Sequence, residues 1–121
     1  MDVVDAFLQA VTGNESGGDY DVVNRIGARG RYQFIQSTYN EWADDPDDWS
    51  PEAQDRAARK MATYLINNYG FRGAFEAWMG GEGGIGHEDW SDGNTTIGEY
   101  ADNGMRQMEE ILANNGENPI D

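Results

Sequence analysis

Glu15 is the residue of this sequence whose type and surroundings best suit acid catalysis. It follows an apolar segment, residues 3–11, and stands in the run Asn14-Glu15-Ser16-Gly17-Gly18, whose small residues leave space around a carboxyl group. Glycoside cleavage requires a carboxylic acid that stays protonated near neutral pH, and burial beside apolar groups raises the pKa of a carboxyl group in that direction. Most glutamates at helix ends are merely solvated or cap the helix, so the neighbouring motifs decide how Glu15 is interpreted.

The segment that follows, residues 27–33, has the form G-A-x-G-x-x-Q, and residues 34–39 continue it as F-x-x-S-T-aromatic. Preceded by E-S-G-G, this order of motifs closely resembles the core of lytic transglycosylases, goose-type lysozymes and resuscitation-promoting factors. The resemblance implies that Glu15 is the catalytic acid and that the loop bearing Gln33 lines a sugar groove. It extends from about Val4 to about Met108, nearly the whole chain.

Two later segments match the same families less specifically. Residues 77–81, A-W-M-G-G, are similar to the family segment A-Y-N-A-G, and residues 96–100 are similar to the stretch that brings a tyrosine toward the catalytic glutamate. Met79 stands where the families usually have a substrate-contacting asparagine, and Arg31 and Tyr32 replace a common Leu-Met, which predicts a more polar groove. The resemblance implies these substrate-binding residues: Ser16, Gly30, Tyr32, Gln33, Trp78, Met79 and Tyr100.

The reaction implied by the resemblance is cleavage of the MurNAc–GlcNAc β-1,4 bond of peptidoglycan, with no metal and no cofactor. In a lytic transglycosylase one carboxyl group acts as general acid and then as base, while a hydroxyl of the substrate closes an anhydro ring. A hydrolytic muramidase would need a second carboxylate, roughly 6.5–9.5 Å away if inverting or about 5 Å away if retaining. We favour transglycosylase chemistry, and keep as possible second carboxylates Asp19, Asp21, Glu76 and Glu82.

The spacing of apolar residues predicts an all-α fold, a compact lysozyme-like single domain of about five helices with long active-site loops. The domain spans residues 1–121, with 117–121 as a flexible tail. Asp2, Ser50 and the pair Thr96 and Glu99 have the types and spacing of helix caps. The predicted helices cover about 2–12, 37–43, 51–66, 71–80 and 96–115, and the glycine-rich residues 14–30 form a long loop.

Composition narrows the possible partners. Eight basic residues against 23 acidic ones give a net charge of −15, which argues against nucleic acid and anionic membranes as partners. The sequence has no apolar run of about 20 residues and no secretory signal, so we expect a protein made in the host cytoplasm. Such a wall enzyme suits a bacteriophage, acting from the virion, beside other virion proteins, or released at lysis.

Other signals are weaker. Residues 81–86 fit G-x-G-x-x-G but follow no strand, and Asp89, Asp92 and Asn94 lack the spacing of an EF-hand. His87 is the only histidine and lies among glycines and acids, which predicts an exposed residue. Two alternatives to an enzyme stay open: a catalytically decayed lysozyme-like wall-binding module of a virion, with Met79 marking the decay, and an acidic inhibitor or nucleic-acid mimic.

Overall fold

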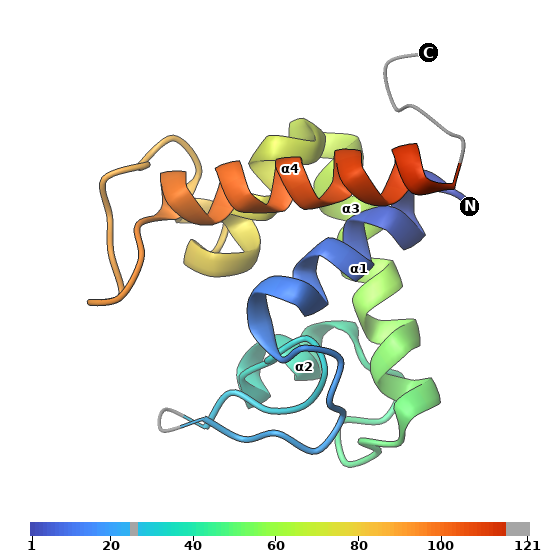
Figure 1. The fold of residues 1–121 in the computed structure, drawn as a ribbon. Helices are drawn as coiled ribbons and strands as arrows, with labels where there is room; N and C mark the ends of the chain where they lie inside the picture. Colours follow the sequence, from blue (N-terminus) through green and yellow to red (C-terminus); the bar gives the residue numbers. More distant parts are fainter. Residues whose placement is uncertain (25–26, 116–121) are drawn as a thin grey trace.

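Helices dominate the computed structural model, which describes residues 1–24 and 27–115 (Figure 1). In these two ranges, pairing between extended segments is limited to three isolated bridges, so the predicted all-α class is confirmed. The predicted tail, 117–121, lies outside the described residues. The elements in chain order are α1 (Val3–Glu15), α2 (Gln36–Trp42), α3 (Pro51–Gly80), the short 3-10 helix η1 (Glu82–Gly84) and α4 (Ile97–Asn114).

The three long helices begin where the sequence places capping residues. The side chain of Asp2 caps α1, and that of Ser50 caps α3 with Pro51 in the first turn. Thr96 and Glu99 form a reciprocal capping box at the start of α4. Each cap satisfies backbone N–H groups that have no partner within the helix, so these short-range signals fix the start of each long helix.

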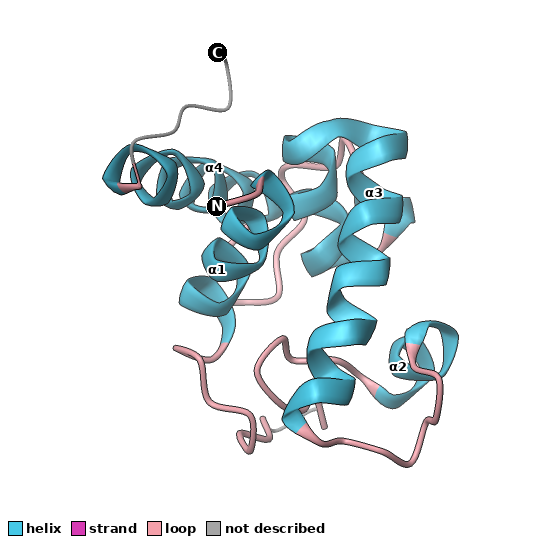
Figure 2. Cartoon of the chain, turned by 90° about the vertical axis from the view of Figure 1, so that its right-hand side faces the viewer, coloured by secondary structure: helices cyan, strands magenta, loops and turns pink. Residues whose placement is uncertain are grey.

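The long helix α3 joins two of the predicted helices across a break at Gly70. This residue has φ 76° and ψ 178°. A positive φ lies outside the helical region and is a conformation that glycine adopts more readily than other residues. The prediction of separate helices over 51–66 and 71–80 is therefore close to the observed backbone. Figure 2 shows the helix changing direction, so that its second part approaches α4 while its first part runs down toward α2.

A chain of aromatic rings connects the helical core to the region of α2. Phe7 lies 4.3 Å from Phe75 and 5.7 Å from Trp78, measured between ring centroids. Trp78 is in turn 5.9 Å from Phe34, which is 5.4 Å from Tyr39. Burial of these rings supplies much of the hydrophobic stabilisation of so small a domain. They also attach the loop that carries Phe34 to the second part of α3.

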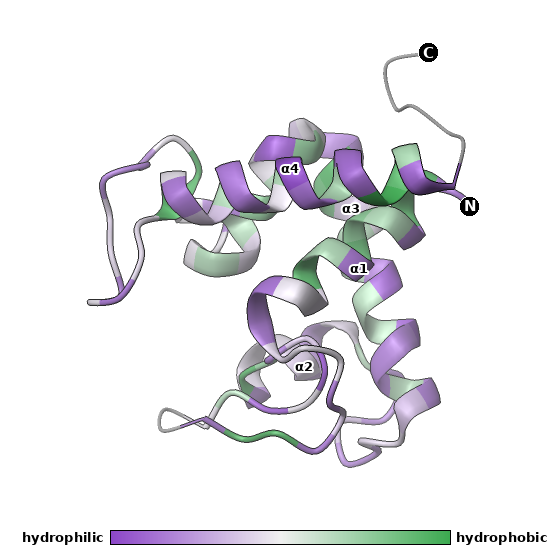
Figure 3. Cartoon of the chain, viewed as in Figure 1, coloured by the Kyte–Doolittle hydropathy of each residue, from purple (hydrophilic) through white to green (hydrophobic). Residues whose placement is uncertain are grey.

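The α4 helix completes the core by packing across α1 and α3, where Figure 3 shows the strongest hydrophobic colouring of the helices. Met108 and Leu112 of α4 are buried there, and Gly104 faces the ring of Phe75 so closely that a Cβ atom would collide with it. Among the described residues, every helix is too short or too polar to cross a lipid bilayer. The crossing of α1 and α4 matters for function because it brings Glu15 close to Tyr100.

Candidate active site

A cleft with a volume of about 530 Å³ opens beside the last residue of α1. Its walls come from the end of α1, the loop that follows α1, α2, α3, residues 81–82 and Asp92. Four of the residues predicted to act on substrate line it together: Glu15, Gln33, Trp78 and Met79. A volume of this size is typical of small-ligand sites. The fold thus joins segments that are more than 60 positions apart in the sequence.

Glu15 is half-buried at the end of α1, and its environment favours the protonated form. Burial is the largest influence and raises the pKa of the carboxyl group from 4.5 to about 7. The hydroxyl of Tyr100 opposes this shift, whereas the negative charge of Asp92 adds to it. A carboxyl group with this pKa is present in both protonation states at neutral pH, as general acid–base catalysis requires.

Tyr100 supports Glu15 from the buried side. Its side chain is 5% exposed, and burial together with the nearby Glu15 charge holds the pKa of its phenol well above the usual range. The phenol is therefore a neutral donor directed to Glu15, although its geometry falls short of a regular hydrogen bond with any described residue. The α4 backbone is also tied to α1, since Asn14 Nδ2 donates to the Tyr100 carbonyl at 3.5 Å and Gln107 Nε2 donates to Asn14 Oδ1 at 2.8 Å.

The loop after α1 is held by side chains that bind its backbone. The Ser16 hydroxyl donates to the Arg31 carbonyl at 2.6 Å and accepts from the Gly18 N–H at 2.9 Å. Gln33, which has φ 54°, turns its Nε2 onto the carbonyls of Val22 (3.2 Å) and Gly30 (2.8 Å). Ser16 and Gly30 therefore stabilise the loop without lining the cleft, whereas Gln33 both stabilises the loop and lines the cleft.

Gln54 was not among the residues predicted from the sequence, yet it fixes this loop to α3. Its side chain is 1% exposed; Oε1 accepts from the Arg31 N–H at 3.0 Å, and Nε2 donates to the carbonyls of Tyr20 (3.2 Å) and Trp49 (2.8 Å). Gly30 has φ 83° and packs against the Gln54 amide, where a Cβ atom would collide. One buried amide thus satisfies three backbone groups, two of which lie more than 20 positions away in the sequence.

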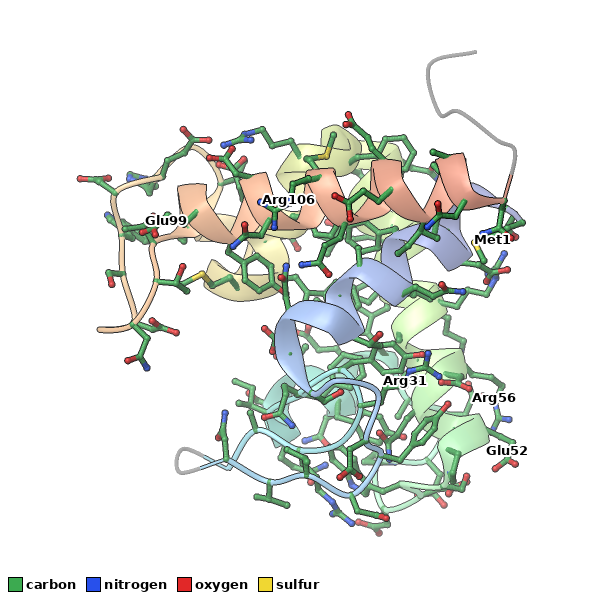
Figure 4. All side chains as sticks on the ribbon, in the orientation of Figure 1. Met1, Arg31, Glu52, Arg56, Glu99 and Arg106 are labelled. Carbon is green, nitrogen blue, oxygen red and sulfur yellow. The ribbon has the colours of Figure 1, made fainter. Side chains whose placement is uncertain are left out.

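Tyr32 lies in the core rather than on the cleft surface. It is 3% exposed, and its hydroxyl donates to Asp55 Oδ1 at 2.6 Å. Asp55 also accepts from the Tyr20 hydroxyl, and Arg31 donates to that hydroxyl at 2.6 Å. Figure 4 shows Arg31 near the start of α3, below α1. A buried ring is not available to stack on a sugar, so this arrangement corrects the sugar contact predicted for Tyr32.

Three further carboxylates line the cleft: Glu41, Glu82 and Asp92. Glu82 was a predicted candidate for a second carboxylate, and it accepts from the hydroxyls of Tyr64 and Tyr69. Asp19, Asp21 and Glu76, the other predicted candidates, do not line it. Asp92 Oδ1 accepts two backbone N–H bonds within its own turn, and these lower its pKa, so it is ionised beside Glu15.

Groups of possible metal ligands are absent from the part of the chain that the structure describes. Among residues 1–24 and 27–115, no three His, Asp or Glu side chains gather where they could hold a metal ion. The acidic turn at 89–94 uses Asp92 to cap its own backbone, as the favoured interpretation of a solvated turn expects. His87 is exposed, as predicted, and stacks on Trp90 with ring centroids 4.0 Å apart.

Comparison with known proteins finds partial similarity to proteins named probable transglycosylase SceD. The chain is 42% identical over 65 residues to the one from Staphylococcus carnosus, covering 48% of this chain and 28% of that protein. Transglycosylase SceD 3 of Staphylococcus saprophyticus is 45% identical over 67 residues, covering 48% and 27%. No family model and no solved structure matches the chain. Over about half its length, this chain is therefore similar to part of proteins named probable transglycosylases, and it spans less than a third of their length.

Proposed function

We propose that this protein is a lytic transglycosylase that cleaves the MurNAc–GlcNAc β-1,4 bond of peptidoglycan, with Glu15 as general acid and then general base. The observation that carries the proposal is the half-buried Glu15 carboxyl group, whose pKa is about 7, on the wall of a cleft. The names of the partial relatives support the same reaction class. The single-domain organisation over residues 1–121 is part of this proposal.

The chemistry follows from the protonation state of Glu15. The protonated carboxyl group gives its proton to the glycosidic oxygen as the bond to the muramyl C1 breaks, and Glu15 becomes a carboxylate. The carboxylate then takes the proton of the muramyl C6 hydroxyl, whose oxygen bonds to C1 and closes the 1,6-anhydro ring. Glu15 is restored to its starting form. Tyr100 keeps the carboxyl group oriented, and Trp78 and Met79 offer surface for the sugar rings.

Hydrolysis is the second candidate, and the ionised Asp92 on the cleft wall favours it. A carboxylate that is close enough to raise the pKa of Glu15 can also activate a water molecule. The two reactions leave different products, because transglycosylation yields anhydromuramyl ends and hydrolysis yields reducing ends that carry an oxygen from water.

Mass analysis of fragments released from purified sacculi in ¹⁸O-labelled water tests both points. We expect anhydro-ended fragments without ¹⁸O, and we expect their release to fall by at least ~100-fold in Glu15→Gln, the range for loss of a general acid. Reducing ends with ¹⁸O would favour the muramidase. Binding without fragments from the parent protein would favour a wall-binding module, and activity retained by Glu15→Gln would rule out the assigned role.

The setting is a further part of the proposal. We propose a bacteriophage product that meets the wall from the virion or at lysis, because delivery by a particle removes the need for an acidic protein to be attracted electrostatically to the wall. Detection of the chain in purified virions would assign it to entry, and its absence there would assign it to lysis.

A further inference from the structure

A second depression, which we call the α3 groove, lies along the first part of α3 and has a volume of about 690 Å³. Its lining combines two aromatic rings, Trp42 and Tyr64, with three basic side chains, Arg56, Arg59 and Lys60. These three are among only eight basic residues in a chain of net charge −15. Figure 4 shows Arg56 on the side of α3 that faces away from α1. The α3 groove thus gathers basic side chains on an otherwise acidic protein.

Two cations of the α3 groove form only exposed ion pairs. Arg56 and Lys60 pair with the same carboxylate, that of Asp44, and all three side chains are about half exposed or more. Exposed ion pairs contribute little to stability, so an incoming carboxylate can exchange with Asp44 at small cost. Arg59 differs, because it binds Asp2 and Asp5 at 2.6 Å and ties the start of α1 to α3. The two residues available to a ligand are therefore Arg56 and Lys60.

Trp42 makes the α3 groove continuous with the cleft that contains Glu15. Its side chain lines both depressions, and its ring centroid lies 5.4 Å from that of Tyr64. Tyr64 in turn donates to Glu82 on the cleft wall at 3.0 Å. A ligand that extends out of the cleft over Trp42 therefore meets an aromatic surface first and then two cations.

We propose that the α3 groove binds the stem peptide of peptidoglycan through its carboxylates, while the glycan lies in the cleft. This inference rests on the proposed function. The peptide is attached to the muramyl sugar and carries both small apolar side chains and free carboxylates. The apolar groups fit Trp42 and Tyr64, and the carboxylates fit Arg56 and Lys60. The groove then makes the protein selective for peptide-bearing strands over bare glycan.

Binding can be tested without any cleavage, by an NMR titration with a synthetic stem tetrapeptide that carries no sugar. We expect the largest shifts at Trp42 and along residues 56–64. Lys60→Glu should weaken binding about fivefold, as for loss and reversal of one exposed ion pair, and Asp44→Asn should strengthen it because it releases both cations. Arg106→Glu, an equal charge change on the exposed surface of α4, is the matched control. Shifts elsewhere, or equal weakening by Lys60→Glu and Arg106→Glu, would overturn the inference.

Cleavage rates provide the second measurement, on murein strands with and without their peptides. We expect Lys60→Glu to slow cleavage of peptide-bearing strands about fivefold and to leave peptide-free strands unaffected. Equal loss on both substrates would overturn peptide recognition. These outcomes differ from failure of the proposed function, which would appear as reducing ends that carry ¹⁸O, as binding without release of fragments, or as release that does not depend on Glu15. Thermal unfolding of each variant separates binding effects from loss of the folded state.

Discussion

The two sides of the cleft are built differently. The first, which we call the α1 wall, consists of Glu15 and the loop residues 16–24 and 27–35. The buried amide of Gln54 in α3 binds Arg31 and Tyr20 of this loop, although these residues are 23 and 34 positions from Gln54 in the sequence. The second, which we call the glycine wall, consists of residues 81–96. Its Asp92 turn and its Ser91–Thr96 bridge are local, and residues 86–94 are all exposed. Its ties to α3 include the exposed Arg72–Glu88 ion pair, the hydrogen bonds from the Tyr64 and Tyr69 hydroxyls to Glu82, and the bond from the Gly86 N–H to Glu76.

We infer that one wall positions Glu15 and that the other controls how a glycan strand reaches it. In the proposed mechanism the acid catalyst must keep its burial and its orientation through the reaction, and the part-buried hydrogen bonds of the α1 wall hold the loop beside it in place. Segments with few buried contacts open at low free-energy cost, and residues 86–94 of the glycine wall, which are all exposed, are of this kind. We infer that the glycine wall moves when a glycan strand enters, while Glu15 and Tyr100 keep their relation to each other.

The largest expected effect breaks the α1 wall directly. Gln54→Ala leaves one backbone N–H and two carbonyl groups, all part-buried, without their partner and empties the space of a buried side chain, and we expect the free energy of unfolding to fall by about 3 kcal/mol. Activity should fall as well, because the loop that carries Gln33 loses one of its attachments to α3. Urea unfolding followed by fluorescence and cleavage of sacculi measure the two effects.

Gln36→Ala is the matched control for this change. Gln36 is exposed on α2 and donates to Asn40 and to the Pro46 carbonyl, so its loss should change the free energy of unfolding by no more than about 0.5 kcal/mol. If both glutamine variants were equally stable, the α1 wall would not depend on Gln54.

Local sequence patterns predict the helix caps well and predict contacts between distant parts of the chain poorly. The caps at Asp2, Ser50 and Thr96 lie within four residues of the groups that they satisfy, so local pattern is enough to predict them. Glu15 was predicted because its motif is also local. Gln54 occupies a position that a polar residue could occupy on any helix surface, and two of its three partners come from distant parts of the chain, so no local signal identifies it.

The same limit explains the residues that were misplaced or missed. Tyr32 belongs to a motif whose position in the families suggested a groove, but its burial depends on Asp55 and Trp78, which are 23 and 46 positions away. Asp92 was recognised only as part of an acidic turn, since its proximity to Glu15 arises from the packing of α4 against α1. Contacts of this kind depend on the tertiary fold rather than on spacing.

A second prediction concerns the cost of keeping Glu15 in its wall. Its folded-state pKa of about 7 exceeds the ordinary value of 4.5, so its stabilising contribution is complete below pH 4.5 and is lost as pH rises through 7. Between pH 4 and pH 8, the free energy of unfolding of Glu15→Gln should therefore rise by about 2 kcal/mol relative to that of the parent. This value is smaller than the full pKa shift implies, because the carboxyl group still faces the cleft and is partly solvated. Chemical unfolding at pH 4 and pH 8 measures this, and an equal difference at both would contradict the assigned pKa.

The smallest effect comes from the glycine wall. The negative charge of Asp92 raises the pKa of Glu15, so Asp92→Asn should shift the alkaline limb of the pH–rate profile toward lower pH by about 0.3 to 0.5 units. Added salt should reduce this difference between variant and parent, because it screens exposed charges. Asp89→Asn removes an equal charge from the same exposed turn but outside the cleft lining, and should shift the limb less. Loss of nearly all activity in Asp92→Asn, with the limb unmoved, would instead make Asp92 a reacting carboxylate and the glycine wall a second catalytic element.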